Sequence, residues 1–549
     1  MVATGVATLR GAALRGAMCL AAMSTAGPRG HLAVGKGVFA DGLAAPAGHI
    51  RIRALTWNVA AVNNNPFEYW ITHNDTAYKT LMTDVENFIL DPGDDDVSVS
   101  DLFSDEMVDR LVSRMDATGV FLNLSTVKQM WTEQYRSRKV VAGFLRDKLL
   151  GTKRLLSMPE RKTNTIKVED GSSVFRPTVM NCYDEELRTL EEWFDKWLAF
   201  FFDRAVKQDG EAHPRPVYKL LKRISRGTYP ALTEQEEEVS HPLQLVLLGA
   251  FDAILVNLLQ KKGGEFWQRL RREICHSLVS HKNELVLNIL TDTYADADVI
   301  FLQEVDNRLE HLLEKRFGDK YQVVRPAKPS SKGQSSMVLL RKSFFSTAEV
   351  EDGPKVTNLE EGDLLVLKTT PEGYNTEVFM ASFHGDTNGL QTAPMLEAVK
   401  QHLGPKRLLF GMDANTHAEP SESKSKAYVK DFETTYHNLG YRSCWGVVDT
   451  SRCTSSDASR CTSFNARTYL QAQLNKATRS TEIWEKGDIN PKDFVLFTNH
   501  FIAGDVFLDN SGTGVFLERT ILPTLQFPSD HAILAVDMVL SLEDRGGEL

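Results

Sequence analysis

Short apolar runs recur along this chain, and a polar side chain that can bind a cation or a phosphate stands at one end of each. The run 299–302, for example, contains no polar residue and is followed by Gln303-Glu304. Continuous apolar runs of this length are typical of strands that are buried on both faces. Because five such coincidences occur, we expect neighbouring strands to present these side chains at one sheet edge. They are Asn58, Glu304, His384, Asp413 with Asn415, and Asp530 with His531.

The arrangement of the apolar runs predicts an α+β fold. A first strand is expected over 50–59, and the turn at 63–66 ends it. From Ala297 onward, strand-like runs predominate and few helical patterns separate them, which is typical of two sheets packed face to face with flanking helices. The other expected strands span 298–302, 321–325, 336–340, 364–368, 378–383, 407–411, 494–497 and 532–539.

The middle of the chain has a different pattern, in which large apolar residues recur at spacings of three and four. This periodicity predicts helices over 78–89, 127–150 and 185–206. The long apolar stretch 243–259 is interrupted by Gln244, Asp252 and Asn257, so a buried helix explains it better than a transmembrane segment.

We therefore expect three parts. Residues 1–47 would form a leader, residues 48–74 and 265–545 a two-sheet domain, and residues 75–264 an inserted all-helical region.

Composition limits the classes of partner and site. The formal net charge of −10 argues against tight nonspecific binding to duplex DNA, but it does not exclude a local basic groove. None of the six cysteines lies in a CxxC pair, which disfavours a thiolate zinc site and favours a reducing compartment.

The part of the leader before Asp41 carries Arg10, Arg15, Arg29 and Lys36 and no acidic residue. This composition is typical of a transit peptide for a mitochondrion or plastid. The alternative is an unstructured leader on a cytoplasmic protein.

The polar residues at the strand ends are suited to the hydrolysis of a phosphoester. That reaction needs a cation near the phosphate, an oriented water and hydrogen-bond donors for the transition state. Mg²⁺ binds oxygen ligands and retains several waters, so one or two carboxylates and an amide oxygen suffice, and Mn²⁺ is the alternative ion. The zinc-binding pattern HExxH is absent from the sequence.

Taken together, these motifs resemble the endonuclease/exonuclease/phosphatase superfamily, which has the DNase I-like fold. The resemblance rests on Trp57-Asn58, Leu302-Gln303-Glu304, Ser382-Phe383-His384, Gly411-Met412-Asp413-Ala414-Asn415, Lys492-Asp493 and Ser529-Asp530-His531, in this order. It covers about residues 48–74 and 265–540, and the helical insertion has no counterpart in the usual plan of the family. One extra residue precedes Asp413, and a polar loop follows His384.

The resemblance implies a role for each motif residue. Glu304 would be the main metal ligand, assisted by Asn58 and Asp530. Asp413 would deprotonate the attacking water, and Asn415 would bind the nucleophile or a phosphate oxygen. His531, held by Asp493, and His384 would contact the phosphate.

The motifs are compatible with several substrates and partners. Arg467 is a candidate for substrate binding, since it lies in a polar stretch shortly before Asp493. A phosphodiesterase or nuclease is the first hypothesis, and a phosphatase for a phosphoinositide or other small phosphomonoester is the second. The substrate would then be a nucleic acid, a nucleotide or a phospholipid head group. A third hypothesis is an inactive scaffold whose helical insertion binds a protein partner. In an enzyme, that insertion would either cover the site or lie on the far side.

Overall fold

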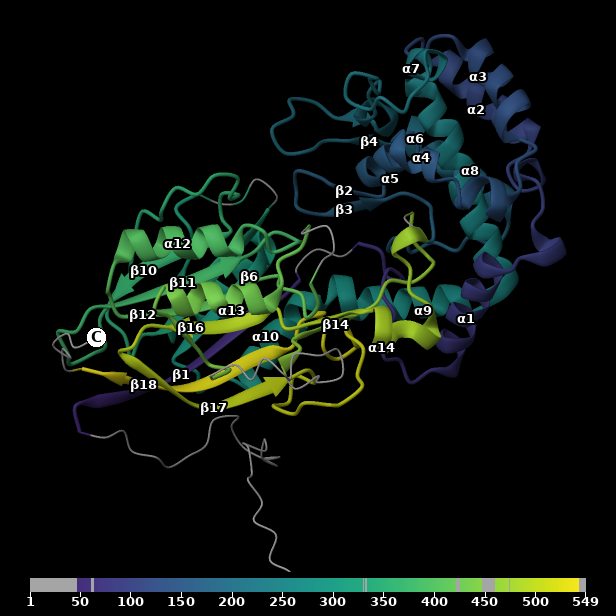
Figure 1. Ribbon diagram of the computed structural model, residues 1–549. Helices are drawn as coiled ribbons and strands as arrows, with labels where there is room; N and C mark the ends of the chain where they lie inside the picture. Colours follow the sequence, from purple (N-terminus) through teal and green to yellow (C-terminus); the bar gives the residue numbers. More distant parts are fainter. Residues whose placement is uncertain are drawn as a thin grey trace, which may run out of the picture.

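A computed structural model describes residues 47–60, 64–328, 330, 333–420, 425–446, 460–472 and 474–542, and it contains two six-stranded sheets (Figure 1). The strand order of the first sheet is β17 (Phe501–Asp509), β18 (Ile533–Ser541), β1 (His49–Asn58), β6 (Val299–Asp306), β8 (Gln334–Arg341) and β7 (Tyr321–Val324). The order of the second is β13 (Arg442–Ser443), β16 (Asp493–Phe497), β12 (Leu408–Asp413), β11 (Val378–His384), β10 (Leu364–Thr369) and β9 (Glu349–Val350).

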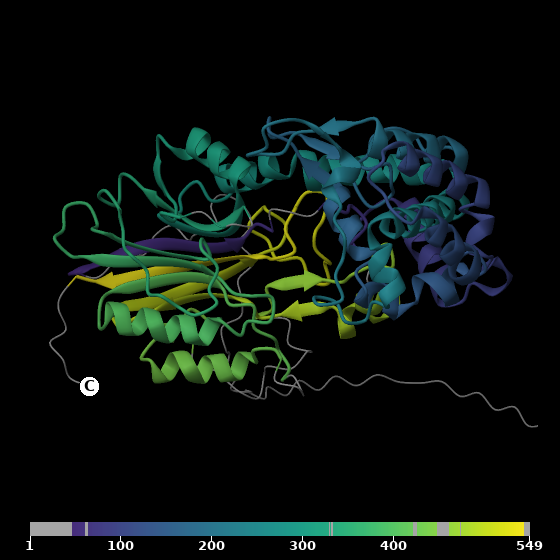
Figure 2. The same cartoon turned by 90° about the horizontal axis from the view of Figure 1, so that it is seen from above.

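The two sheets pack face to face through an apolar layer, and helices cover their outer faces (Figures 1 and 2). The sheets approach closely at Gly411, where a Cβ atom would lie 2.4 Å from the ring of Phe301. The first sheet is covered by α10 (Lys282–Asp292) and α11 (Asn307–Phe317), and the second by α12 (Thr392–Leu403) and α13 (Val429–Asn438). The predicted α+β fold, with two sheets packed face to face and flanking helices, is confirmed.

All nine predicted strands are present, but the edge strand β17 was not predicted. Its residues are mostly half-buried or exposed, and a bulge between Ala503 and Val506 interrupts its pairing with β18. A strand with an exposed face and an irregular register lacks the continuous apolar run that marks a central strand.

Helices dominate the region between β1 and β6. They are α1 (Thr76–Leu90), α2 (Asp105–Ala117), α3 (Leu124–Met130), α4 (Lys148–Thr152), α5 (Ser157–Thr163), α6 (Leu190–Phe202), α7 (Glu234–Glu238), α8 (Ser240–Gly263) and α9 (Phe266–Cys275).

The prediction of an all-helical insertion was wrong in detail. Two short hairpins, β2 (Thr165–Lys167) with β3 (Ser173–Phe175) and β4 (Ala205–Val206) with β5 (Arg215–Pro216), lie between the helices. Strands this short carry too few residues to show an alternating pattern.

Two of the predicted helices also have different boundaries. Residues 127–150 do not form one helix. They comprise the end of α3, two π-helical segments (Trp131–Tyr135 and Val140–Leu145) and the start of α4. Val140 donates its backbone N–H to Val97, so the chain leaves the helix there to make a tertiary contact. The helix predicted over 185–206 is shorter, because Thr189 caps it at its start and it ends at Phe202.

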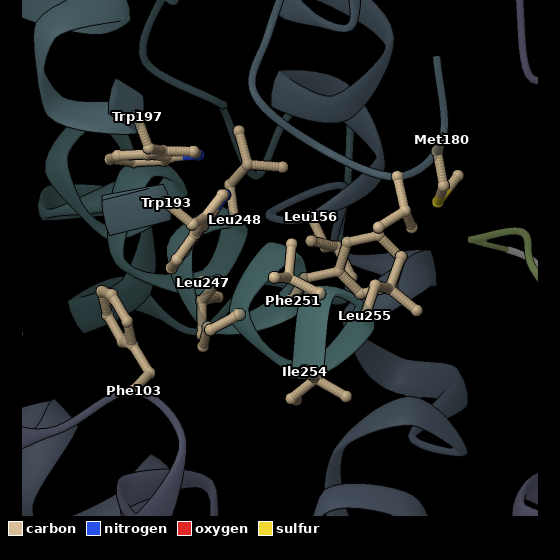
Figure 3. Packing of buried hydrophobic residues seen from close by; sticks show 14 of the residues in the cluster. Phe103, Leu156, Met180, Trp193, Trp197, Leu247, Leu248, Phe251, Ile254 and Leu255 are labelled. Atoms are coloured by element: carbon tan, nitrogen blue, oxygen red, sulfur yellow. The ribbon is translucent and has the colours of Figure 1, made fainter. Parts of the chain in front are cut away.

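Helix α8 is the central element of this region and is apolar on all sides. Figure 3 shows Phe103, Trp193 and Trp197 near its residues Leu247 and Leu248. Among the described helices, only α8 is long and apolar enough to cross a membrane, but 94% of the relevant window is buried inside the protein. That is the environment of a core helix.

One fully buried ion pair joins a residue of α8 to the segment after β3. Asp252 accepts hydrogen bonds from Arg176 at 2.8 Å, from Thr178 at 2.7 Å and from the indole of Trp197 at 3.0 Å. The side chains of Asp252 and Arg176 are both 0% exposed. Arg176 and Asp252 therefore neutralise each other, and burying either charge without the other would cost much more free energy.

We expect Asp252→Ala to destabilise the protein strongly, because it leaves the guanidinium of Arg176 buried without its counterion. Removing one partner of a buried pair typically costs about 3–5 kcal/mol. Urea unfolding followed by circular dichroism measures this. Asp195→Ala, which removes an exposed partner of Arg110, is the matched control and should cost no more than about 1 kcal/mol. Equal losses in the two variants would contradict this role of the buried pair.

A disulfide joins Cys182 to Cys275 at the end of α9. The two residues are 93 positions apart, and no spacing motif in the sequence indicated their pairing. The bond closes a long loop that contains much of the helical region.

The helical region packs against the sandwich at one end (Figures 1 and 2). Its apolar core continues into Phe67 and Trp70, which follow β1, and into Ala466 and Leu470, which precede β16. The backbone N–H of Trp70 donates to Ala466 at 2.8 Å. The segment that leads from β1 into the helical region is therefore joined to the segment before β16, which also packs against that region.

Candidate active site

Strand register brings the motif residues to one edge of the sandwich. Strand β1 runs parallel to β6, so Asn58 pairs with Gln303, next to Glu304. Strand β11 runs parallel to β12, so His384 pairs with Asp413. Because β16 is antiparallel to β12, its first residue, Asp493, pairs with Asp413 at the end of β12. The ends of some strands and the starts of others therefore meet at the same edge.

Asp413 lies at the centre of this group and is fully buried. One oxygen, Oδ2, accepts from the amide of Asn58 at 2.8 Å and from that of Asn415 at 3.3 Å. The other, Oδ1, accepts from the backbone N–H of Asn415 at 2.8 Å. Asn415 also donates to the carbonyl of Gly385 at 2.9 Å and has a φ of +49°. These contacts fix the orientation of the carboxylate.

Glu304 interrupts β6 with a left-handed backbone, at a φ of +56°. The register with β8 shifts between Leu302 and Val305, so the glutamate stands in a bulge and turns away from the regular alternation. Its carboxylate accepts from Asn58 at 3.1 Å and from Gln334 at 3.0 Å. Non-glycine residues with this conformation concentrate at functional sites, where surrounding contacts maintain the strain.

His384 connects the central carboxylates. Its Nε2 atom lies 3.2 Å from Oε1 of Glu304 and 3.9 Å from Oδ2 of Asp413, and its Nδ1 atom faces Asp363 at 3.8 Å. Burial would lower the pKa of His384, but Asp363 and Glu304 raise it well above its usual range. Burial would likewise raise the pKa of Glu304, but His384 and Asn58 lower it to about 2. The histidine is therefore a cation beside a carboxylate anion.

Asp493 and His531 form a second buried pair. Nδ1 of His531 lies 2.9 Å from Oδ2 of Asp493, and Nε2 lies 3.9 Å from Oδ2 of Asp413. Burial would lower the pKa of His531, but Asp493 and Asp413 raise it to about 10. Burial raises the pKa of Asp493 despite this pairing. Because the hydrogen bond to Asp493 uses Nδ1, the Nε2–H of His531 is directed toward the group around Asp413.

Asp530 and Arg467 lie at the rim of this edge. Oδ2 of Asp530 accepts from Asn465, in β14 (Ser463–Asn465), at 2.7 Å. Arg467 forms an ion pair with Glu68 and stands 5.3 Å from the ring centre of Tyr69. Burial, followed by the charge of Asp530, raises the pKa of Tyr69 well above its usual range. The structure thus places Arg467 near Asp530.

Two buried lysines lie near these carboxylates, and only Lys492, which precedes Asp493 in its motif, was named from the sequence. Lys282, at the start of α10, is 4% exposed and donates to the backbone carbonyl of Ala60. Burial lowers its pKa to about 8, although Asp530 and Glu304 oppose this shift. Lys492 donates to Asp488 at 2.7 Å and faces the charges of Asp413 and Asp530.

Lys282 carried no sequence signal that would have identified it, because it begins a helix and has no motif around it. Lys492 was recognisable only through the motif that it shares with Asp493. In the fold both reduce the net negative charge of the carboxylate group.

The donor set fits a hard divalent cation. Glu304 and Asp530 both lie near Lys282 and near Tyr69, since the charges of both carboxylates act on the pKa of each of these residues. Carboxylate oxygens are the ligands that Mg²⁺ prefers. Asn58, in contrast, directs its amide nitrogen to Glu304 and Asp413, and its oxygen accepts from the N–H of Ala60 at 2.8 Å. As placed, Asn58 therefore positions carboxylates and does not offer an oxygen to a cation.

A second arrangement of possible ligands overlaps the first. Asp413, Asp493 and His531 each have a ligand atom within 4.8 Å of the others, and all three are buried. Asp493 and His531 are hydrogen-bonded to each other through Oδ2 and Nδ1.

Comparison with known proteins gives a family match within the helical region. Residues 96–272 match a family described as a domain of unknown function (DUF8234). No curated protein matches the chain.

The chain also resembles solved structures of endonuclease/exonuclease/phosphatase proteins. One of them is described as the family member from Bacteroides vulgatus, with 12% identity and a TM-score of 0.32 over 48% of this chain and 93% of that one. Another is TDP2 from D. rerio complexed with a single-strand DNA product, with 16% identity and a TM-score of 0.31 over 47% of this chain and 90% of that one. A third is a mannosyl-6-phosphatase from Bacteroides thetaiotaomicron, with 12% identity and a TM-score of 0.30 over 47% and 90%.

These three matches have identities of 12–16% and TM-scores of 0.30–0.32. At such identities and TM-scores, we take no activity or substrate from them. The assignment of the fold rests on the two sheets of this chain and their strand order.

Proposed function

We propose that this protein is a divalent-metal-dependent phosphoester hydrolase, with Mg²⁺ as the natural ion and Mn²⁺ as a substitute. One observation carries the proposal. Both sheets direct their polar strand-end residues to a single edge, where carboxylates, amides and two cationic histidines lie within hydrogen-bond or ion-pair distance of one another. This combination matches the needs of phosphoester hydrolysis.

Each residue has a distinct task in this proposal. Asp413, buried and held by Asn58 and Asn415, accepts a proton from the attacking water. His531 donates from Nε2 to a phosphoryl oxygen, and Asp493 fixes its orientation. His384 donates to the phosphate or assists the leaving group from the other side.

Glu304 and Asp530 would hold the cation, which supplies positive charge to the phosphate oxygens and lowers the pKa of bound water. Asn58 would keep Glu304 and Asp413 in place.

A phosphodiester is the substrate class that we propose first. The entrance carries Arg467, whose guanidinium can bind a phosphate, beside the ring of Tyr69, which can pack against a base or another flat group. A phosphomonoesterase acting on a phosphoinositide or another small phosphate ester is the alternative.

The helical insertion is proposed to border the substrate path. Its core includes Phe67 and Ala466, which lie next to Glu68 and Arg467 at the entrance. It therefore packs close to the site-bearing edge and would limit the size of the substrate. We keep the domain boundaries at 48–74 with 265–545 and at 75–264 as proposals. A protein partner for this region, and an organellar location if the leader is a transit peptide, are also proposals.

Activity of the purified protein against a panel of substrates tests the function. Bis-nitrophenyl phosphate, single-stranded RNA, nicked DNA and a phosphoinositide would each be offered with Mg²⁺ and with EDTA. We expect hydrolysis of at least one diester with Mg²⁺ and none with EDTA. Hydrolysis that persists in EDTA would contradict the metal dependence, and a complete lack of turnover would favour the scaffold.

A further inference from the structure

A cavity lies in the helical region, and none of the residues of the candidate active site lines it. It has a volume of about 450 Å³ and is formed by helix α5, strand β5, the 3₁₀ turn Val217–Leu220 and the segment that follows. Helix α5 and strand β4, the partner of β5, are labelled in Figure 1. The whole cavity falls within residues 96–272, which match the family of unknown function.

The wall of this cavity is basic, although the protein as a whole is acidic. Four basic side chains line it: Lys162, Arg215, Lys222 and Arg223. No aspartate or glutamate lines it, and the stretch 212–233 contains no acidic residue at all. Arg154 stands 5.9 Å from the ring centre of Tyr229, another lining residue, and adds positive charge nearby.

Most of this charge is not neutralised within the part of the chain that the structure describes. Lys162 and Lys222 make no ion pair there. Arg223 donates its Nε–H to a backbone carbonyl, that of Glu237, at 3.1 Å. Arg215 does pair with Glu211, but its Nε atom has no hydrogen-bond partner. Like charges gathered without counterions favour the binding of an anion.

The rest of the wall is apolar or carries hydroxyls. Leu220, Leu221 and Ile224 supply apolar surface, and Ser225 and Thr228 can donate hydrogen bonds. A cavity of this volume is at the lower end of the range found for small-molecule sites, about 300–1,000 Å³. It accommodates a ligand of about the size of a mononucleotide.

We propose that this cavity binds a small phosphorylated molecule of mononucleotide size. The phosphate would lie against Lys162, Lys222 and Arg223, and the flat or apolar part of the ligand would pack on Leu220, Leu221 and Tyr229. This site is independent of Glu304 and of any metal ion, so the proposal does not depend on the proposed catalytic function.

Calorimetric titration of the full-length protein in EDTA tests the proposal. The probes are adenosine monophosphate and phenyl phosphate, with adenosine as the probe that lacks a phosphate. We expect both phosphates to bind, adenosine to bind at least about tenfold more weakly, and Glu304→Gln to leave the binding unchanged. A failure of both phosphates to bind would overturn the proposal, as would loss of binding in Glu304→Gln.

Two variants with matched controls locate the ligand. Lys222→Glu and, on a different element, Lys162→Glu should each weaken phosphate binding about tenfold or more. Their controls are Lys219→Glu and Arg161→Glu, which make the same charge change on neighbouring residues that do not line the cavity.

Equal losses in a variant and its control would show a nonspecific charge effect and would contradict the site. Tight binding of a single-stranded oligonucleotide without binding of either small phosphate would replace the proposed ligand class by a nucleic acid. Melting temperatures of all four variants show whether each one folds, and Lys162→Glu keeps the test decisive if Lys222→Glu does not.

Discussion

Replacing Glu304 by glutamine is expected to reduce kcat/KM for the best phosphodiester substrate by about 10³-fold or more. The change removes a negative charge that we assign to cation binding, and it leaves the shape of the side chain almost unchanged. A cation stabilises the transition state by several kcal/mol, and about 4 kcal/mol corresponds to a factor of about 10³. Steady-state hydrolysis at one fixed Mg²⁺ concentration, the same for the wild type and the variant, measures the loss.

Glu310→Gln is the matched control for this variant. Glu310 lies on α11, directly after β6, and pairs with Arg325 away from the site. We expect its activity to remain within about twofold of the wild type, since Arg325 is exposed and an ion pair with an exposed partner contributes little. The assignment of Glu304 would be wrong if Glu304→Gln retained wild-type activity while folding normally.

Replacing His531 by asparagine is expected to lower kcat by about 10²–10³-fold and to change KM little. The imidazolium donates to a group that becomes more negative in the transition state, and removing one such donor typically costs this much. The geometry behind the prediction is the 2.9 Å contact of Nδ1 with Asp493, which leaves Nε2 as the donor. Single-turnover kinetics separate this effect from binding.

A double-mutant cycle with Asp493→Asn tests whether the two residues act as a unit. Asp493→Asn alone should also reduce kcat, because the histidine loses its orienting partner and part of its positive charge. The double variant should be about as slow as His531→Asn alone, since groups that act together are not additive. Strictly additive losses would mean that Asp493 does not act through His531.

The motif residues were predictable because their positions follow from strand geometry. An apolar run that ends at Glu304 or Asp413 predicts a buried strand and a polar terminus, and parallel or antiparallel pairing then brings these termini together. The central strands were predicted for the same reason. The edge strand β17 was not, because an exposed and bulged strand leaves a weaker pattern.

Tertiary contacts between distant segments could not be predicted in this way. Lys282 approaches the carboxylates only because α10 packs under β6, and Glu68 meets Arg467 only because the segment after β1 pairs with the segment before β16. The pairing of Cys182 with Cys275 also depends on how the helices pack. None of these contacts has a periodic signal along the chain.

The roles of the asparagine amides could also be predicted only in part. Asn58 was predicted to help hold the ion or its waters, yet its amide hydrogens are donated to Glu304 and Asp413. The sequence identified the residue as part of the site. The backbone N–H of Ala60 donates to the amide oxygen of Asn58. The amide nitrogen of Asn58 therefore faces the carboxylates.

Binding of Mn²⁺ tests the central claim most directly, namely that Glu304 and Asp530 hold a divalent cation at this edge. Electron paramagnetic resonance measures free Mn²⁺ during titration of the wild type, Glu304→Gln and Asp530→Asn. We predict one site in the wild type, for which Mg²⁺ competes, and a loss of affinity of about tenfold or more in each variant. Unchanged Mn²⁺ binding in both variants, or no binding to the wild type, would contradict the account.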